Sequence, residues 1–296
     1  MATLRDIRSR IKGVKNTQQI TKAMKMVAAA KLRRAQDSML AARPYSRKIK
    51  ALLTDLVTDE RVQEHPLVKA RAEVKTIALV VVTADRGLCG SFNSNLIKSA
   101  VRLINSEFAD YQESGNLNLI TIGRVGSEFF KKRGYKVTYS NFGLFGHLSM
   151  SEAKTINAHL NDGFLSGKYD KIVVISNEFK NVMTPKVTIT QLLPVQQQTS
   201  VSDDNHYHAD YIFEPDPVQI IESLVPLYLL QQIWQVLLES YASEQGARMS
   251  AMDAATENAK ELLRNLTLNY NRVRQAAITK EILEIISGAE SLSKSS

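Results

Sequence analysis

The nine residues from Asp85 to Asn93 (DRGLCGSFN) come closest in this sequence to a ligand-binding or catalytic loop. They follow a β-branched run at 76–83 that predicts a buried strand, and the loop after the first strand of a doubly wound sheet is a common phosphate or nucleotide site. The loop matches neither G-x-G-x-x-G nor G-x-x-x-x-G-K-[ST]. We therefore favour a structural turn over a nucleotide site: Gly87 and Gly90 permit the bend, and a polar side chain (Asp85, Ser91 or Asn93) caps the following helix.

Other residues capable of chemistry are scattered. His206 and His208 could offer two imidazoles to a metal ion, but no other histidine lies within forty residues of them. Cys89 is the single cysteine, which excludes an internal disulfide and any site that needs two thiolates. No Ser, His and acidic residue are set at a recognisable turn as a hydrolytic triad requires. The sequence predicts no catalytic residues, no metal site and no cofactor.

The elements that would position the loop form an alternating series. Expected strands lie at 76–83, 117–122, 135–139, 171–176 and 187–193, and expected helices at 93–108, 125–133 and 151–165. Such alternation predicts a mainly parallel sheet in a three-layer, Rossmann-like α/β domain, which we place at residues 74–208. Its last part, 196–208, is polar and aperiodic and predicts a surface loop.

Long helices are predicted at both ends of the chain. Near the N-terminus, Thr3 and Asp6 are a candidate helix cap. Apolar residues then repeat every three or four positions in two series: Leu4, Ile7, Ile11 and Val14, then Ala28, Leu32, Ala35, Met39 and Ala42. Between them lie the polar residues 16–19 and a rotated stripe of Ile20, Met24 and Val27, so we expect the contact face to shift along the helix.

The C-terminal region carries a matching series at Ala259, Leu263, Leu266, Tyr270, Val273 and Ala277. Spacings of three and four residues are those of a coiled-coil seam. We expect residues 1–57 and 209–296 to form an antiparallel coiled coil into which the α/β domain is inserted. The most apolar window, 224–238, falls short of the roughly 20 apolar residues that span a bilayer, and no hydrophobic leader precedes the first helix.

Positive charge is concentrated at the N-terminus. The first fifty residues hold fourteen Lys or Arg and two acidic residues, a net charge of +12 in a chain of +8. Nucleic acid or an acidic protein would each suit such a helix. Apolar residues interrupt the basic run, and the chain supplies its own partner helix, so we favour an acidic protein over nucleic acid.

Three of these segments resemble the γ subunit family of F-type ATP synthase, and the resemblance extends over essentially the whole chain. They are the N-terminal helix from Ile7 to Gln36, the loop from Asp85 to Asn93, and the C-terminal stretch from Tyr270 to Ile282. The resemblance implies an antiparallel coiled coil with a Rossmann-like domain that binds no cofactor. It also implies a mechanical role as the central shaft within a ring of three α and three β subunits, with the α/β domain as a foot that joins the ε subunit and the c ring.

The same resemblance implies particular contacts. Lys22, Met24 and Lys25 would lie near an acidic segment of β, and Arg274, Gln275 and Thr279 would meet a β loop. Ile285, Ile286 and Leu292 would form the apolar end that turns in an upper bearing, although ordinary coiled-coil packing explains them equally well. The implied setting is the cytoplasmic face of a bacterial inner membrane. The alternative is an α/β enzyme with a helical hairpin for oligomerisation, which nucleotide binding would distinguish.

Overall fold

The computed structural model describes residues 3–56, 64–181, 185–195 and 217–294. The chain divides into two compact units. The helical unit consists of Met1–Val27 and Met249–Ser296, and the sheet unit consists of Ala28–Arg248. The expected 196–208 loop, with His206 and His208, lies outside the described residues.

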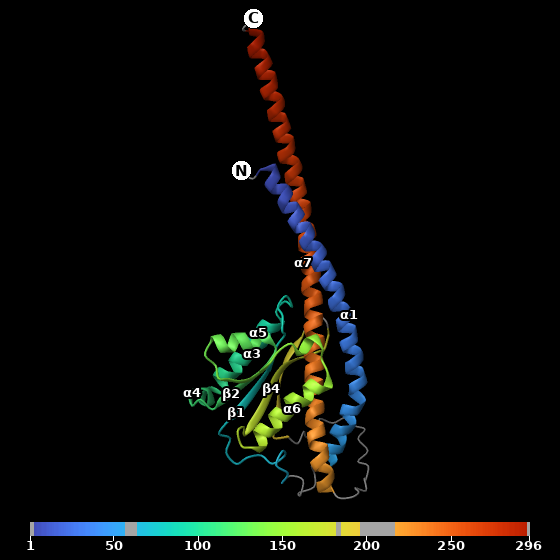
Figure 1. Cartoon of the computed structure of the whole chain (residues 1–296), viewed down its shortest axis with the longest axis vertical. Helices are drawn as coiled ribbons and strands as arrows, with labels where there is room; N and C mark the ends of the chain where they lie inside the picture. The colour runs from blue at the N-terminus through green and yellow to red at the C-terminus, as the bar shows by residue number, and fades with distance from the viewer. Residues whose placement is uncertain (1–2, 57–63, 182–184, 196–216, 295–296) are drawn as a thin grey trace. The chain divides into compact units, whose positions relative to one another are not determined.

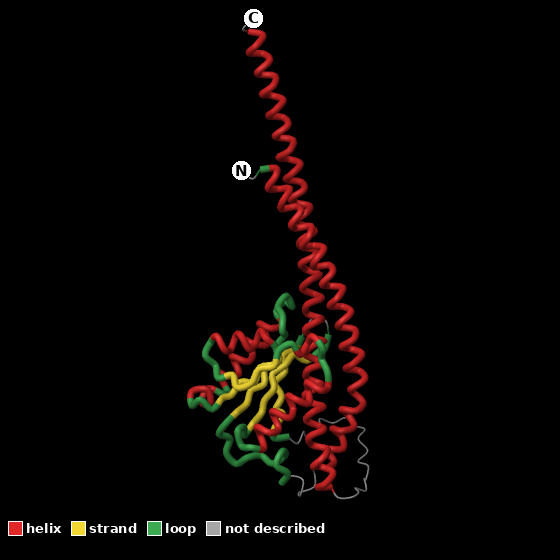
Figure 2. Tube along the Cα trace, viewed as in Figure 1, coloured by secondary structure: helices red, strands yellow, loops and turns green. Residues whose placement is uncertain are grey.

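In the described residues, the sheet unit is built on five strands in the order β3-β2-β1-β4-β5. Figure 2 draws this sheet in yellow. The strands are β1 (Ile77–Val82), β2 (Leu117–Ile122), β3 (Val137–Asn141), β4 (Lys171–Glu178) and β5 (Lys186–Leu193). The first four are parallel, and β5 pairs antiparallel with β4. All six residues of β1 and of β2 are buried, because both faces of the sheet are covered. The expected mainly parallel sheet is confirmed.

Helices cover the two faces of this sheet (Figure 1). The described helices of the whole chain are α1 (Leu4–Leu56), α3 (Phe92–Ser106), α4 (Ala109–Glu113), α5 (Arg124–Lys132), the short η1 (Leu144–Gly146), α6 (Met150–Leu165) and α7 (Pro217–Lys294). Leu79 and Val81 of β1 face a core shared with α3 and Phe130 of α5, whereas Val80 and Val82 face α6 and α7. Successive side chains of a strand point to opposite faces, so this alternation produces the three layers.

Most of the predicted elements agree with the structure within two residues, and the differences have local causes. The helix expected at 93–108 is α3, which ends two residues early at Ser106. Phe108, which is 4% exposed, stands at the N-cap of the separate short helix α4, which was not expected. β3 begins two residues later than expected, at Val137. Pro44 and Pro226 lie inside α1 and α7 respectively, which are continuous through them.

The apolar part of α7 packs against the sheet. By length and composition alone, Gln219–Ser287 is the one described helix that could cross a membrane. A core helix meets the same criteria, and five of its side chains are at most 4% exposed in the core between α7 and the sheet: Ile221, Val225, Leu229, Ile233 and Leu237. Burial against the sheet therefore accounts for the hydrophobicity of this region.

In the helical unit, the first part of α1 pairs with a middle stretch of α7, where Asp253, Thr256 and Tyr270 contact it. Thr3 and Asp6 form the expected cap, since the Asp6 amide donates to Thr3 Oγ1 (3.3 Å) and the Thr3 amide donates to Asp6 Oδ2 (3.0 Å). On α7 the predicted seam is buried or half-buried from Ala259 to Val273, as expected. Ala277 is exposed, since it lies beyond the part of α7 that pairs with α1.

The expected shift of the α1 contact face is wrong. The inward residues continue the three-and-four spacing without a break: Leu4, Ile7, Ile11, Val14, Gln18, Thr21 and Lys25. Ile20 and Val27 are instead 59% and 56% exposed. The polar residues remain in the seam because they have partners there: the Thr256 hydroxyl donates to Thr21 Oγ1 at 2.8 Å, and Lys25 pairs with Asp253 at 2.5 Å.

Candidate functional site

The predicted contact residues of α1 lie at the edge of the seam. Lys22 is exposed, and Met24 and Lys25 are half-buried. Lys25 Nζ lies 2.5 Å from Asp253 Oδ1, so this lysine links the two helices and is only partly available to another protein. We call Lys22, Met24 and Lys25 the Lys22 surface.

The predicted contact residues of α7 lie beyond the paired region. Arg274, Gln275 and Thr279 are all exposed, and we call them the Arg274 surface. Further along the helix, Ile285 is 67% exposed and Ile286 is 50% exposed. Leu292 belongs to α7, but its side chain lies outside the described ones.

The structure does not bring these two surfaces together. Lys25 faces Asp253, whereas Arg274 lies 21 residues further along α7, which at 1.5 Å per residue is about 30 Å. The Arg8 guanidinium donates to the Tyr270 hydroxyl at 2.8 Å, which places the start of α1 close to Arg274. The surfaces are therefore two separate contact regions on one coiled coil.

Exposed apolar side chains accompany the Lys22 surface, and the sequence analysis did not identify them as a surface. Ile20, Met26 and Val27 are 59%, 60% and 56% exposed. The seam at this level is filled by the polar residues Thr21 and Lys25. Along this part of α1 the polar residues lie in the seam and the apolar residues face outward. This inverted pattern could have indicated the surface from the sequence, and contact with a partner protein would explain why apolar side chains are exposed.

The basic character of α1 is not neutralised by α7 within the helical unit. Residues 1–27 carry seven Lys or Arg and one acidic residue, and residues 249–296 carry six of each sign. The unit therefore has a formal charge of +6, all of which comes from α1. A large excess of one sign on a coiled coil favours an oppositely charged partner.

The turn from Asp85 to Asn93 is occupied by the chain's own hydrogen bonds. Asn93 Oδ1 accepts from the Ala84 amide at 2.9 Å, and Asp85 Oδ1 accepts from the amides of Arg124 (3.2 Å) and Gly143 (2.9 Å). Thr83 Oγ1 accepts from the Gly126 amide at 2.9 Å. Amides near the start of α5, which could otherwise meet a phosphate at the end of β1, are thus already paired.

Two details of the predicted turn are corrected by this geometry. Ser91 stands at the N-cap of α3 but makes no side-chain cap hydrogen bond. Asp85 accepts from the Arg124 amide and Asn93 from the Ala84 amide, so neither side chain caps α3. The left-handed residues of the bend are Leu88 (φ 61°) and Gly90 (φ 58°), not Gly87. A structural turn is nevertheless what this loop forms.

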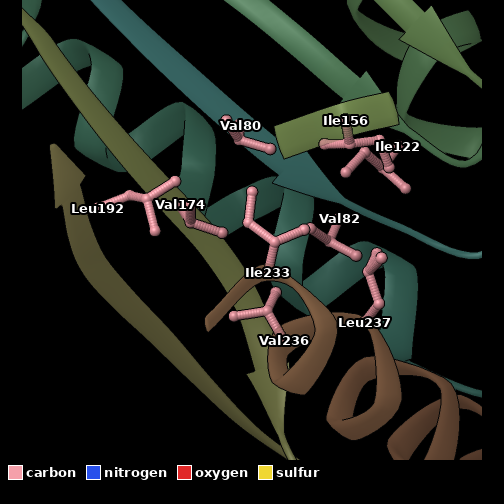
Figure 3. A pocket seen from close by; sticks show the side chains of 9 residues that line it. All are labelled: Val80, Val82, Ile122, Ile156, Val174, Leu192, Ile233, Val236 and Leu237. Atoms are coloured by element: carbon pink, nitrogen blue, oxygen red, sulfur yellow. The ribbon is translucent and has the colours of Figure 1, made fainter. Parts of the chain in front are cut away.

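The space between the sheet and α7 is too small for a nucleotide. The cavity between them has a volume of about 20 Å³. It is lined entirely by Val, Ile and Leu side chains from the sheet, α6 and α7, which Figure 3 shows. Ligand pockets usually have volumes of about 300–1,000 Å³ and a few polar groups. In the parts of the chain that the structure describes, no three His, Cys, Asp or Glu side chains are placed to hold a metal ion.

Comparison with known proteins identifies the family. A family model described as ATP synthase matches residues 3–292. The chain is 53% identical to the ATP synthase gamma chain of Chloroherpeton thalassium, with 100% of both chains covered, and 51% identical to that of Chlorobaculum tepidum, with 99% of both covered. The chain belongs to the ATP synthase gamma chain family.

Solved structures support the same assignment. A chain from the central stalk and c ring of Tetrahymena thermophila mitochondrial ATP synthase matches with a TM-score of 0.62 at 26% identity, covering 80% of this chain and 99% of that one. A chain from Euglena gracilis mitochondrial ATP synthase matches with a TM-score of 0.69, covering 98% of this chain and 94% of that one. At 20% identity, the second likeness supports the fold alone. The expected coiled coil with an inserted Rossmann-like domain is confirmed.

Proposed function

We propose that this chain is the central rotor shaft of an F-type ATP synthase, which couples ion-driven rotation of a c ring to ATP synthesis and hydrolysis at the β subunits. The observation that carries the proposal is the helical unit. Its seam is buried, while a +6 charge and apolar side chains such as Ile20 and Val27 remain on the outside. Membership in the gamma chain family over nearly the whole sequence supports the same role.

In this role the chain is a non-catalytic subunit, present once per complex. Its partners are three α and three β subunits around the coiled coil, and the ε subunit and c ring at the α/β domain; nucleic acid is not a partner. The complex places the chain peripherally at the cytoplasmic face of a bacterial inner membrane. Near the end of β1 the amides of Ala84 and Gly126 are already paired with side chains of the chain itself, which supports a structural role for the α/β domain.

Rotation can be coupled to chemistry because the shaft is asymmetric. Three chemically identical β subunits meet different faces of the coiled coil, so each orientation favours a different nucleotide state. The Lys22 surface would meet an acidic segment of β, and the Arg274 surface would meet a β loop. Exposed ion pairs contribute only about 0–1 kcal/mol each, which suits contacts that must form and break on every turn. Ile285, Ile286 and Leu292 would turn in an apolar bearing.

Single substitutions in the reconstituted complex test the two surfaces. Lys22→Ala and Arg274→Ala remove exposed charges without disturbing the seam, whereas Lys25 would confound the result through Asp253. We expect lower torque and fewer ions pumped per ATP hydrolysed for both variants. Lys260→Ala, which removes an exposed partner of Glu257 on the same helix, is the matched control.

Two results would contradict the proposal. Unchanged torque and ion pumping in both variants would count against these contact surfaces. Tight binding of ATP or NAD by the purified chain, together with stable homo-oligomers, would support the enzyme alternative instead. Copurification of the chain with α, β and ε subunits at one copy per complex is the expected outcome.

A further inference from the structure

A buried ion pair on α7 contacts the turn that follows β1. Glu244 and Arg248 are one helical turn apart and form a charge-assisted hydrogen bond, with side-chain exposures of 6% and 12%. Burial raises the pKa of Glu244, and the adjacent Arg248 guanidinium opposes that rise. A buried charge pair is not a strong source of stability by itself. Another contact of Arg248 suggests what the pair does.

The second guanidinium nitrogen of Arg248 reaches across to the turn. Nη2 lies 3.3 Å from the Arg86 carbonyl oxygen and 3.2 Å from the Gly87 carbonyl oxygen, and donates to both. The planar guanidinium can serve Glu244 and these carbonyls at once, which an ammonium group cannot do in the same geometry. Arg248 therefore ties α7 to the backbone immediately before Leu88.

The backbone at Leu88 needs an external restraint. Its φ of 61° is in the left-handed region, which costs a residue with a Cβ roughly 1–2 kcal/mol. The Leu88 side chain is 66% exposed, so its own packing offsets little of that cost. The next residues are fixed on the inside, where Asn93 Nδ2 lies 3.2 Å from Cys89 Sγ and Cys89 is 2% exposed.

The position of this contact in the sheet is also informative. The connections run outward from β1 to β2 and β3 on one side and to β4 and β5 on the other. The carboxyl end of β1 is thus the switch point where doubly wound folds usually bind a ligand. Here a side chain of α7 contacts the turn at that point instead.

We propose that Arg248 is a positioning residue that clamps the turn from Asp85 to Asn93 onto α7 and holds Leu88 in its left-handed conformation. Glu244 orients the guanidinium, and the carbonyl oxygens of Arg86 and Gly87 accept its hydrogen bonds. The clamp keeps Cys89 covered and fixes the direction in which Leu88 is presented at the surface. It acts within the single chain, so it is independent of the proposed rotor function.

The reactivity of Cys89 measures the clamp directly, because it is the chain's single thiol. The full-length chain is treated with an aromatic disulfide reagent that releases a coloured thiolate on reaction. We expect Arg248→Met to raise the reaction rate about tenfold or more, through local opening of the turn. Arg248 also lowers the pKa of Cys89, against the larger effect of burial. Loss of the Arg248 charge would raise the pKa of Cys89 and so slow the reaction. A faster reaction would therefore report greater exposure of the Cys89 thiol.

Two further variants keep the test decisive if Arg248→Met fails to fold. Arg248→Lys retains the charge and can still pair with Glu244. It lacks the second guanidinium nitrogen that donates to the turn carbonyls, so we expect Cys89 to react faster than in the wild type. The double change Arg248→Met with Glu244→Gln leaves no unpaired buried charge, and should also react faster. In each case the rate should depend little on low concentrations of urea, as expected for local rather than global opening.

Lys260→Met is the matched control, since it removes a basic residue of α7 whose 3.4 Å contact with Glu257 is exposed. Its Cys89 rate should stay within about twofold of the wild-type rate, as for most surface substitutions. Wild-type rates in Arg248→Lys and in the double variant, with normal circular dichroism, would overturn the proposal. A rate that rises steeply with urea would also overturn it, because it would show that Arg248 only stabilises the whole fold.

Discussion

A buried hydrogen bond between α1 and α7 in the sheet unit gives a quantitative prediction. Gln231 Nε2 donates to Ser46 Oγ at 2.7 Å, and the two residues are 4% and 8% exposed. Ser46→Ala removes the acceptor and leaves a buried amide donor without its partner. The cost of such a group is about 1–3 kcal/mol, so we expect the free energy of unfolding to fall by about 2 kcal/mol.

The partner substitution distinguishes an unpaired donor from lost packing. When Gln231→Leu is added to Ser46→Ala, no buried polar group remains unpaired, and most of the lost stability should return. Urea unfolding followed by circular dichroism measures Ser46→Ala, Gln231→Leu and the double variant in one double-mutant cycle. Ser38→Ala is the control, because Ser38 is an exposed serine of α1 whose hydroxyl donates to the Arg34 carbonyl at 3.0 Å. A double variant as unstable as Ser46→Ala alone would refute the reasoning.

Three further predictions concern Leu88, Asp170 and the exposed pair Ile282 and Ile285. Leu88→Gly should raise the free energy of unfolding by up to about 1 kcal/mol in a urea titration, because glycine adopts the observed φ of 61° without strain; a loss of stability would contradict this. Burial would raise the pKa of Asp170, but hydrogen bonds from two backbone amides and from Arg71 lower it below its ordinary value. Asp170 therefore stabilises the fold above the pKa of an unfolded aspartate, and this contribution is lost as the pH falls through the lower folded value. Asp170→Asn should be less stable than wild type by about 2 kcal/mol at pH 7, with a gap that narrows below about pH 4; a gap independent of pH would be inconsistent with this account. Ile282 and Ile285 are 50% and 67% exposed, so the isolated chain should self-associate at high concentration. Changing both to Asn should reduce that association in sedimentation experiments, and unchanged association would contradict this account.

Local patterns were sufficient to predict the α/β domain. The run of buried β-branched residues at β1 and the alternation of strands and helices predicted the layers and the mainly parallel sheet. These signals are strong because a strand covered on both faces must be apolar along its whole length. Element boundaries were predicted less exactly, as at the end of α3, which stops two residues short of the expected helix.

The coiled coil was predicted less completely. Apolar spacing identified both helices, but it suggested a shifted face at Ile20 and Val27, which the structure shows to be exposed. A pattern of apolar residues cannot reveal a seam position filled by a polar side chain. The roles of Thr21 and Lys25 depend on Thr256 and Asp253, more than 200 residues away in the sequence.

The sequence by itself determined the fold class, the family and the concentration of positive charge on α1, because periodicity, motif order and composition are local properties. Only the tertiary structure decided where the charged and polar groups lie relative to one another and which of them are paired. It placed the Lys22 and Arg274 surfaces apart on one coiled coil, paired the amides at the end of β1, and brought Arg248 to the carbonyls of Arg86 and Gly87. Those contacts join residues distant in sequence, so they exist only once the helices and the sheet have packed.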